Sequence, residues 1–459
     1  MVLGIDIGST FIKSSILDLE TLSIQHSSSV PTPDFIDKSG YTREIPIEAL
    51  ADLVKKMIED AVASYAVEGI LFSVQMHGFM LFERNGNPIT NYISWQDMRG
   101  NFMGDQEDAA SFIRHSVNHN LLAQNGIFLK NTHSLSPLYC YMKQKKISEP
   151  VHFSMMGDGI IRLLTGTVPP IHSTVAASSG LYSLTAKDWN RELADELGLG
   201  NLFFPPVDDG PEPAAFYTSA EKKCIPIYTA VGDHQAAVLG ACTEDDHTVI
   251  NIGTGGQISY VDKGLHFGTY ETRPFFYGRT LRALTQLPSG RSLNVLADFV
   301  MDIGQHVFSV PQIAPAEVWK LLDHMAEEAQ SADDGEPDLR VNLSFFNHTA
   351  PDSGSIMEIG SSNLRVGNLF YRAYAYMAAE YCTAFQKLFS DTDSQTSAII
   401  YTGGVLRKSR LLQQLIQKKL KRPCHLAPHA EDTMIGLLRL ALWYGGYKAE
   451  FETQLLTVK

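Results

Sequence analysis

The chain has little of what marks disulfide-rich, nucleic-acid-binding or membrane proteins. Its five cysteines are scattered through 459 residues and lack any C-x-x-C spacing, which favours reduced thiols in the cytoplasm over a disulfide framework. Acidic residues outnumber basic ones, 51 against 37, and the net charge of −14 disfavours binding to nucleic-acid phosphates or anionic membranes. No signal segment and no uncharged apolar run of membrane-spanning length is present. We therefore expect a cytoplasmic protein without nucleic-acid or membrane partners.

What is present is typical of a folded protein with more than one domain. The hydrophobic content of 44% and the charged content of 19% are ordinary for globular chains, and the length allows two or three domains. Helical and strand patterns alternate along the chain, which favours an α/β layered fold. The patterns predict helices over 45–66, 235–241, 364–389 and 409–419, strands over 69–74, 226–231 and 397–402, and a hairpin over 79–94.

One short pattern occurs twice, once in each half of the chain. An apolar strand leads into a turn of glycine and hydroxyl residues, and a second strand follows that ends at an aspartate, Asp18 or Asp262. Backbone N–H groups in such a turn can approach an anion closely because glycine has no side chain. We interpret the repeat as a duplicated domain that holds one phosphate-bearing ligand between two turns. The turns contain Gly8, Ser9 and Thr10 in the first half and Gly253, Thr254 and Gly255 in the second.

Acidic side chains follow two of the predicted strands. Asp233 comes after the strand over 226–231 and before a helix, so it is either a helix N-cap or a general base that accepts a proton from an alcohol. Asp6 either bonds its own turn or holds Mg²⁺ through water, as carboxylates near phosphates do. Lys13 is either a solvated strand residue or a group that neutralises phosphate charge. Parallel strand ends are where open α/β sheets bind ligands.

Two further segments carry polar groups suited to a polyol. Gln-Met-His-Gly at 75–78 follows an apolar strand, and Trp-Gln-Asp-Met-Arg at 95–99 places an acid and a base behind an aromatic ring. His77 is either a structural histidine or a sugar ligand. Asp97 and Arg99 form either a local ion pair or a set of donors and acceptors for sugar hydroxyls.

These motifs, in this order, resemble those of the FGGY family of carbohydrate kinases in the actin-like ATPase superfamily. The resemblance covers nearly the whole chain. The matching segments are Asp-Ile-Gly-Ser-Thr at 6–10 with Lys13, the two segments above, Gly-Asp-His-Gln-Ala-Ala at 232–237, Ile-Gly-Thr-Gly at 252–255, and Thr-Gly-Gly at 402–404 with Ser409.

The resemblance implies a two-domain actin-like α/β fold with a central cleft. The sugar would bind mainly to residues 1–242, and ATP with Mg²⁺ mainly to residues 243–459. Asp233 would be the catalytic base, and Asp6 would organise Mg²⁺. Sugar contacts are implied for Gln75, Met76, His77, Trp95, Asp97, Arg99 and Asp233. Phosphate and nucleotide contacts are implied for Gly8, Ser9, Thr10, Lys13, Gly253, Thr254, Gly255, Gly403 and Gly404.

Within the family, the Trp-Gln-Asp loop, the run Asn-Val-Leu-Ala-Asp-Phe-Val at 294–300 and the short length are similar to sedoheptulokinases. They imply phosphorylation of sedoheptulose at its 7-hydroxyl, with xylulose as the alternative substrate. Val405 departs from the family's adenosine motif, and Met-Gly-Asp at 156–158 stands where many relatives have His-Asp. A chaperone-like or filament-forming ATPase and a sugar-binding regulator without catalysis are the alternatives of other classes. The sequence does not decide between a monomer and a homodimer.

Overall fold

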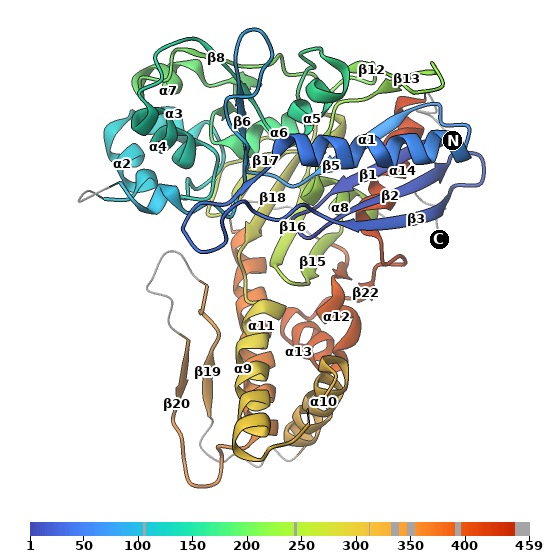
Figure 1. Ribbon diagram of the computed structural model, residues 1–459. Coiled ribbons are helices and arrows are strands. Elements are labelled where there is room, and N and C mark those ends of the chain that lie inside the picture. The colour runs from blue at the N-terminus through green and yellow to red at the C-terminus, as the bar shows by residue number, and fades with distance from the viewer. Residues whose placement is uncertain are drawn as a thin grey trace.

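The computed structural model describes residues 1–103, 107–242, 246–311, 313–331, 339–346, 354–390 and 396–445. In Figure 1 the first half of the chain occupies the upper part of the molecule, and helices of the second half form the lower part. The expected boundary after residue 242 lies at the edge of a segment, 243–245, that is outside the described residues, so the boundary stays a prediction.

The first half is built on a mixed sheet whose strands run β12-β13-β5-β1-β2-β3. β1 pairs antiparallel with β2 and parallel with β5, as expected for a hairpin followed by a crossover helix. β14 also pairs parallel with β5, beyond the end of β13. The bounds are β1 Val2–Ile7, β2 Phe11–Asp18, β3 Ser23–Pro31, β5 Ile70–Val74, β12 Ala215–Thr218, β13 Cys224–Ile227, β14 Val231–Gly232 and crossover helix α1 Ile47–Ser64.

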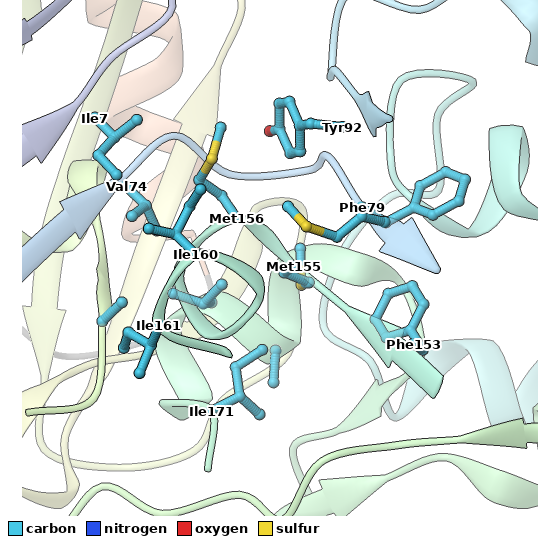
Figure 2. Close-up of a cluster of buried hydrophobic side chains, with 14 of the residues drawn as sticks. Ile7, Val74, Phe79, Tyr92, Phe153, Met155, Met156, Ile160, Ile161 and Ile171 are labelled. Atoms are coloured by element: carbon cyan, nitrogen blue, oxygen red, sulfur yellow. The ribbon is translucent and has the colours of Figure 1, made fainter. Parts of the chain in front are cut away.

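Shorter elements cover one side of this sheet. Helix α5 packs its apolar face onto the sheet, and Figure 2 shows Ile7 and Val74 beside Met156 and Ile160 of that helix. The bounds are β4 Glu44–Ile45, β6 Met80–Phe82, β7 Tyr92–Ile93, α2 Ala109–Ser116, α3 His119–Ala123, α4 Leu135–Lys145, β8 Val151–Ser154, α5 Met156–Thr165, α6 Ser173–Ala176, β9 Tyr182–Ser183, β10 Asp188–Trp189, α7 Arg191–Glu196 and β11 Leu202–Phe203.

The second half repeats the plan with a sheet in the order β17-β18-β16-β15-β21-β22. The hairpin of β15 and β16 corresponds to that of β1 and β2, and β21 pairs parallel with β15. The bounds are β15 Thr248–Ile252, β16 Gly256–Asp262, β17 Glu271–Pro274, β18 Thr280–Thr285, α9 Gly290–Asp302, α10 Pro315–Ser331, β19 Arg340–Asn342, β20 Ser355–Met357, α11 Val366–Leu388, β21 Ile399–Thr402, α12 Gly404–Lys408, α13 Arg410–Leu420 and β22 Cys424–Leu426.

Two helices join the halves. Helix α14 (Asp432–Tyr444) enters the upper part of the molecule and crosses α8 (Asp233–Ala241) while also contacting β1 (Figure 1). The crossing is close because both helices have glycine there: a Cβ at Gly240 would lie 1.8 Å from the Asp432 carbonyl oxygen, and one at Gly436 would lie 2.0 Å from that of Ala236. Buried Arg439 donates to the carbonyl of Cys242, with a distance of 2.5 Å. The two halves are therefore tied through these helices.

Most predicted elements are confirmed, with two corrections. The strand expected over 226–231 is divided into β13 and β14, and Tyr228–Ala230 lies in neither strand. The hairpin expected over 79–94 survives only as bridges between Phe79 and Ile93 and between Phe82 and Pro88, because β6 pairs with β8 and β7 pairs with β4. The first change reflects a one-residue shift in the register of β13 and β14 along the same strand, β5. In the second, strands distant in sequence take the local backbone as their partner.

Candidate active site at the strand ends

Parallel pairing brings three predicted site residues to one sheet edge. Ile7 of β1 lies opposite Val74 of β5, and Val74 lies opposite Gly232 of β14. Asp6 therefore lies at the carboxyl end of β1, Gln75 directly after β5, and Asp233 directly after β14. This juxtaposition could not follow from sequence spacing, since 227 positions separate Asp6 from Asp233 (233 − 6). The sheet edge becomes a cluster of two carboxyl groups and an amide.

The cluster is desolvated and incompletely hydrogen-bonded. Asp6 Oδ1 and Gln75 Oε1 are both buried and have no hydrogen-bond partner in the described part of the structure. Asp233 Oδ1 accepts a hydrogen bond from the His234 backbone N–H at 2.7 Å. Buried polar atoms in proteins are nearly always paired, so acceptors left open at a strand end indicate a place for a ligand.

Burial also changes the protonation of both carboxyl groups. Desolvation raises the pKa of Asp6 to about 6, and the nearby Ser73 hydroxyl, followed by the positive charge of Lys13, opposes that rise. Desolvation raises the pKa of Asp233 to about 7, and the nearby Asp6 carboxylate adds to the rise. A carboxyl group whose pKa is near neutral can take a proton at physiological pH and release it again. Asp233 thus has the protonation behaviour of a general base.

The first glycine turn is held in place by its neighbours. The Gly8 N–H donates to the Phe11 carbonyl, and the Gly8 carbonyl accepts from Thr32 Oγ1 at 2.9 Å and from Gln75 Nε2 at 3.3 Å. Ser9 and Thr10 are exposed at the tip. Lys13 lies opposite Asp6 in the β1–β2 register, and its Nζ is 2.8 Å from Glu431 Oε2, just before α14. The predicted phosphate ligand Lys13 therefore has an ionic partner from the second half.

The second glycine turn and the predicted nucleotide segment form one unit. Gly290 N–H, at the start of α9, donates to the Gly253 carbonyl, and Ser289 Oγ donates to the Thr254 carbonyl. Gly403 has a φ of +86°, and a Cβ there would lie 2.5 Å from the Ile252 carbonyl. Gly255 and Gly404 face open space. The turn is thus held on one side by hydrogen bonds from Ser289 and Gly290, while its backbone remains accessible on the side where an anion would bind.

Met76 and His77 follow Gln75 in the segment directly after β5. The Nδ1–H of His77 donates to the Ser178 carbonyl at 2.8 Å, which leaves its other ring nitrogen for a different partner. The His77 backbone is left-handed with a φ of +67°, and its ring stacks on His133 with centroids 4.6 Å apart. Burial lowers the pKa of His77 to about 4, so the ring is neutral near pH 7. Met76 Sδ lies against Gly232, immediately before Asp233.

The segment at 95–99 is tightly bonded to itself and its surroundings. Asp97 accepts hydrogen bonds from Arg99 Nε at 2.7 Å and Nη2 at 2.9 Å, and from the Arg43 backbone N–H at 2.8 Å. Arg99 also pairs with Glu44 at 2.6 Å. Both Asp97 and Arg99 are buried, whereas Trp95 is half-buried. A direct sugar contact by Asp97 or Arg99 stays a prediction, and their structural pairing is what the geometry displays.

Several polar residues near the cluster were missed by sequence reasoning. Tyr92 is fully buried, its hydroxyl has no hydrogen-bond partner in the described structure, and it lies over Gly78. Glu271 and Arg273 of β17 reach the same region from the second half, where Glu271 pairs with Lys130. The sequence signal for the latter pair is a pair of opposite charges at alternate positions of the short strand β17.

The carboxylate oxygens at these strand ends are suitable ligands for a hydrated magnesium ion. Mg²⁺ in phosphate-transfer sites keeps several waters and uses one or two carboxylates. Asp6, with its open oxygen, satisfies that requirement beside Asp233. Among the described residues, no group of three His, Cys, Asp or Glu side chains comes together as a dedicated metal cage. Nor does any helix of the described chain have the length and apolar character to cross a bilayer.

The two halves have similar sheets, each built on a hairpin, and crossing helices join them near the acidic strand ends. This arrangement is the two-domain actin-like ATPase fold. A family model described as "FGGY family of carbohydrate kinases, N-terminal domain" matches residues 1–240. The chain belongs to the FGGY family of carbohydrate kinases.

Named relatives agree with that placement. A xylulose kinase of Staphylococcus epidermidis is 25% identical over 315 residues, covering 64% of this chain and 61% of that protein. The aligned part thus spans about three fifths of that relative's length. A gluconate kinase structure from Lactobacillus acidophilus superposes with a TM-score of 0.82 at 19% identity, covering 99% of this chain and 91% of that one. A Plasmodium falciparum glycerol kinase structure with ADP gives 0.81 at 15% identity, covering 99% and 91%. These two structures support the fold.

Proposed function

We propose that this protein is an ATP-dependent sugar kinase that transfers the γ-phosphoryl group of ATP to a primary hydroxyl of a ketose, with sedoheptulose as its substrate. The proposal rests on the environment of Asp233, a partly buried carboxyl group at a strand end whose pKa is raised to about 7. Its neighbours Asp6 and Gln75 each have a buried oxygen that accepts no hydrogen bond from the described residues.

The proposed chemistry follows from the position of Asp233. One of its oxygens is held by the His234 backbone N–H, and the second is free to accept the proton of a sugar hydroxyl. The sugar oxygen that loses this proton then attacks the γ-phosphorus. The bond from the γ-phosphorus to the bridging oxygen breaks, and ADP leaves. Phosphoryl transfer depends mainly on alignment and charge stabilisation, so few residues need to react.

The remaining residues of the chain bind and orient. His77 and Met76 would hold the ketose beside Asp233, and Tyr92 offers in the same region a hydroxyl that no described residue hydrogen-bonds. The backbone at Gly8 and Gly255, together with Lys13, would hold phosphate oxygens, and Gly403 and Gly404 would line the adenosine pocket. Mg²⁺, when bound, neutralises the charge that spreads over the transferred phosphoryl group. Asp6 would hold that ion through water.

The substrate is a finer question than the reaction. The Trp-Gln-Asp loop and the run at 294–300, which lies on α9, support sedoheptulose. Xylulose is the second candidate because several of the similar relatives, among them those of Staphylococcus epidermidis and Bacillus subtilis, are xylulose kinases by name. Both sugars present a terminal CH₂OH, so the same base and phosphate sites serve either.

A coupled assay of ADP release tests both levels of the proposal. Purified protein with MgATP would be given sedoheptulose, xylulose, ribulose and fructose, and kcat/KM would be compared. We expect sugar-stimulated turnover with the highest kcat/KM for sedoheptulose. A preference for xylulose would retain the reaction and replace the substrate. Absence of sugar-stimulated ADP release with every sugar would refute the kinase proposal.

A further inference from the structure

A buried chain of hydrogen bonds connects β17 of the second half to the first turn of α8. Glu271 Oε2 accepts from Arg273 Nη2 at 2.5 Å and from Arg273 Nε at 3.1 Å. The third guanidinium nitrogen, Nη1, lies 3.0 Å from His234 Nδ1. Glu271, Arg273 and His234 are all buried, at 2%, 5% and 6% exposure. A charged group so fully removed from water requires a compensating role or partner.

The chain of bonds fixes which ring nitrogen of His234 carries a proton. The Arg273 guanidinium has only N–H donors, so His234 Nδ1 must accept. The Nε2–H then donates to Ser259 Oγ of β16 at 2.8 Å. Burial lowers the pKa of His234 to about 3, with Arg273 adding to the effect, so the ring stays neutral. The side chain is thereby held at both ends by strands of the second half.

His234 is adjacent to the proposed base and in contact with it. Its backbone N–H is the group that donates to Asp233 Oδ1, at 2.7 Å. The next residue, Gln235, donates from Nε2 to the Pro274 carbonyl at 3.3 Å, so β17 contacts two successive residues of the first turn of α8. β17 itself is anchored on the first half through the Thr272 N–H, which donates to the Gly126 carbonyl at 2.7 Å.

We propose that Arg273 is a positioning residue for phosphoryl transfer, which acts through His234 to hold the Asp233 carboxylate in the orientation that accepts the sugar proton. This inference rests on the proposed function and extends it: the second half supplies the nucleotide turn and also fixes the base of the first half. Glu271 and Lys130 complete the arrangement, with Lys130 Nζ 3.4 Å from Glu271 Oε1, and keep the guanidinium in place.

The main test compares R273M with a matched control, R282M. Arg282, on the neighbouring strand β18, is also a buried arginine, and it pairs with Asp262 of β16. Among the described interactions, none joins Arg282 to His234. Both variants lose a buried charge, so both should unfold at lower urea concentration. Only R273M should lower kcat, by roughly 10- to 100-fold, since misplacing a reacting group costs that much. The KM for sugar should change little, and R273K, which keeps a donor and a charge, should restore part of kcat.

The variant H234A breaks the same link from the other end and leaves the pair of Glu271 and Arg273 intact. It should reproduce the loss of kcat, and the double variant R273M/H234A should be no slower than the slower single variant, because the two residues act as one unit. Should R273M not fold, an unchanged kcat in H234A would overturn the proposal. A folded R273M with unchanged kcat would do the same, as would losses that multiply independently in the double variant.

A spectroscopic measurement separates this inference from the proposed reaction. Histidine-selective ¹⁵N NMR of the full chain should show His234, assigned by its absence in H234A, as a neutral ring protonated at Nε2 in the wild type and in R282M. In R273M that tautomer should no longer be fixed. An unchanged His234 spectrum in R273M would refute the link even in an active enzyme. A wild-type protein that phosphorylates no sugar would refute the proposed function and leave the spectroscopic test valid.

Discussion

Two buried clusters of acidic and polar side chains in the first half differ in one respect, the completeness of their hydrogen bonding. At the strand ends, Asp6 and Gln75 each retain a buried oxygen that has no hydrogen-bond partner among the described residues. In the segment at 95–99, Asp97 accepts hydrogen bonds from the Arg99 side chain and from the backbone of Arg43 and Arg99. Both clusters lie in segments that resemble sugar-kinase motifs.

The difference indicates which cluster stabilises the fold and which awaits a ligand. An ion pair whose acceptors are all hydrogen-bonded cannot accept a further hydrogen bond from a ligand. Removal of one partner leaves the other as an uncompensated buried charge. An open acceptor costs free energy in the unliganded protein and is retained where a ligand will satisfy it. We therefore expect substitutions in the two clusters to affect different quantities, catalysis in one and stability in the other.

The largest effect should come from D233N. Asparagine keeps the shape of the side chain and removes the base, so kcat should fall by about 10²- to 10⁴-fold. The steady-state rate of ADP release with saturating sugar and MgATP would be measured alongside thermal unfolding, which should remain cooperative. A kcat within about tenfold of the wild type would place the base elsewhere.

Substitution of the saturated pair should instead reduce stability. D97N leaves Arg99 partly unpaired in a buried site, and we expect the free energy of unfolding to fall by roughly 3–5 kcal/mol. Urea unfolding at neutral pH would measure the loss. If D97N kept wild-type stability and raised only the KM for sugar, the assignment of this cluster to stability would be wrong, because Asp97 would then contact the sugar.

Gly403 and Gly404 allow the same comparison within the nucleotide segment. In G403A the new Cβ would meet the Ile252 carbonyl in a left-handed backbone, so stability should fall by about 1–3 kcal/mol. In G404A no atom lies within 4 Å of the new Cβ, so the fold should be retained and only the ATP dissociation constant should rise. Urea unfolding and nucleotide titration distinguish the two, and equal losses of stability would contradict the assignment of open space at Gly404.

The pH dependence of kcat/KM should reflect the protonation of Asp233, the proposed base. Below the pKa of Asp233, about 7, the carboxyl group is protonated and cannot accept the sugar proton. We therefore expect kcat/KM to rise as pH rises through about 7 and then level off. Initial rates in overlapping buffers would locate the acid limb. A limb near pH 4, the ordinary range for aspartate at about 3.9, would show that Asp233 is solvated in the active form.

The smallest effect should come from the exposed pair of Lys13 and Glu431. Their side chains are 41% and 50% exposed, and pairs of this kind contribute about 0–1 kcal/mol to stability. E431Q should leave unfolding nearly unchanged and release Lys13 for phosphate, which lowers the KM for ATP slightly. K13M is the matched variant and should raise that KM. A marked destabilisation by E431Q would instead make this pair a structural link between the halves.

Much of the architecture follows from local patterns. The periodic apolar residues of α1 and α11, and the paired hairpins ending at Asp18 and Asp262, were predictable because burial on one face requires those spacings. The placement of Gln75 and Asp233 directly after strands was also predictable from the local pattern, whereas the meeting of these strand ends with Asp6 at one edge was decided by the pairing of β1, β5 and β14.

Other features depended on contacts between segments far apart in the chain. The register shift between β13 and β14 along β5, the hydrogen bond from the Arg43 backbone to Asp97, and the delivery of Arg273 to His234 each depend on a partner that no local pattern specifies. The sequence by itself determined the element types, the family and the candidate residues, because these depend on periodicity and motif. Only the tertiary structure decided which polar groups are already bonded and which remain open, because hydrogen-bond partners are set by how the two halves pack.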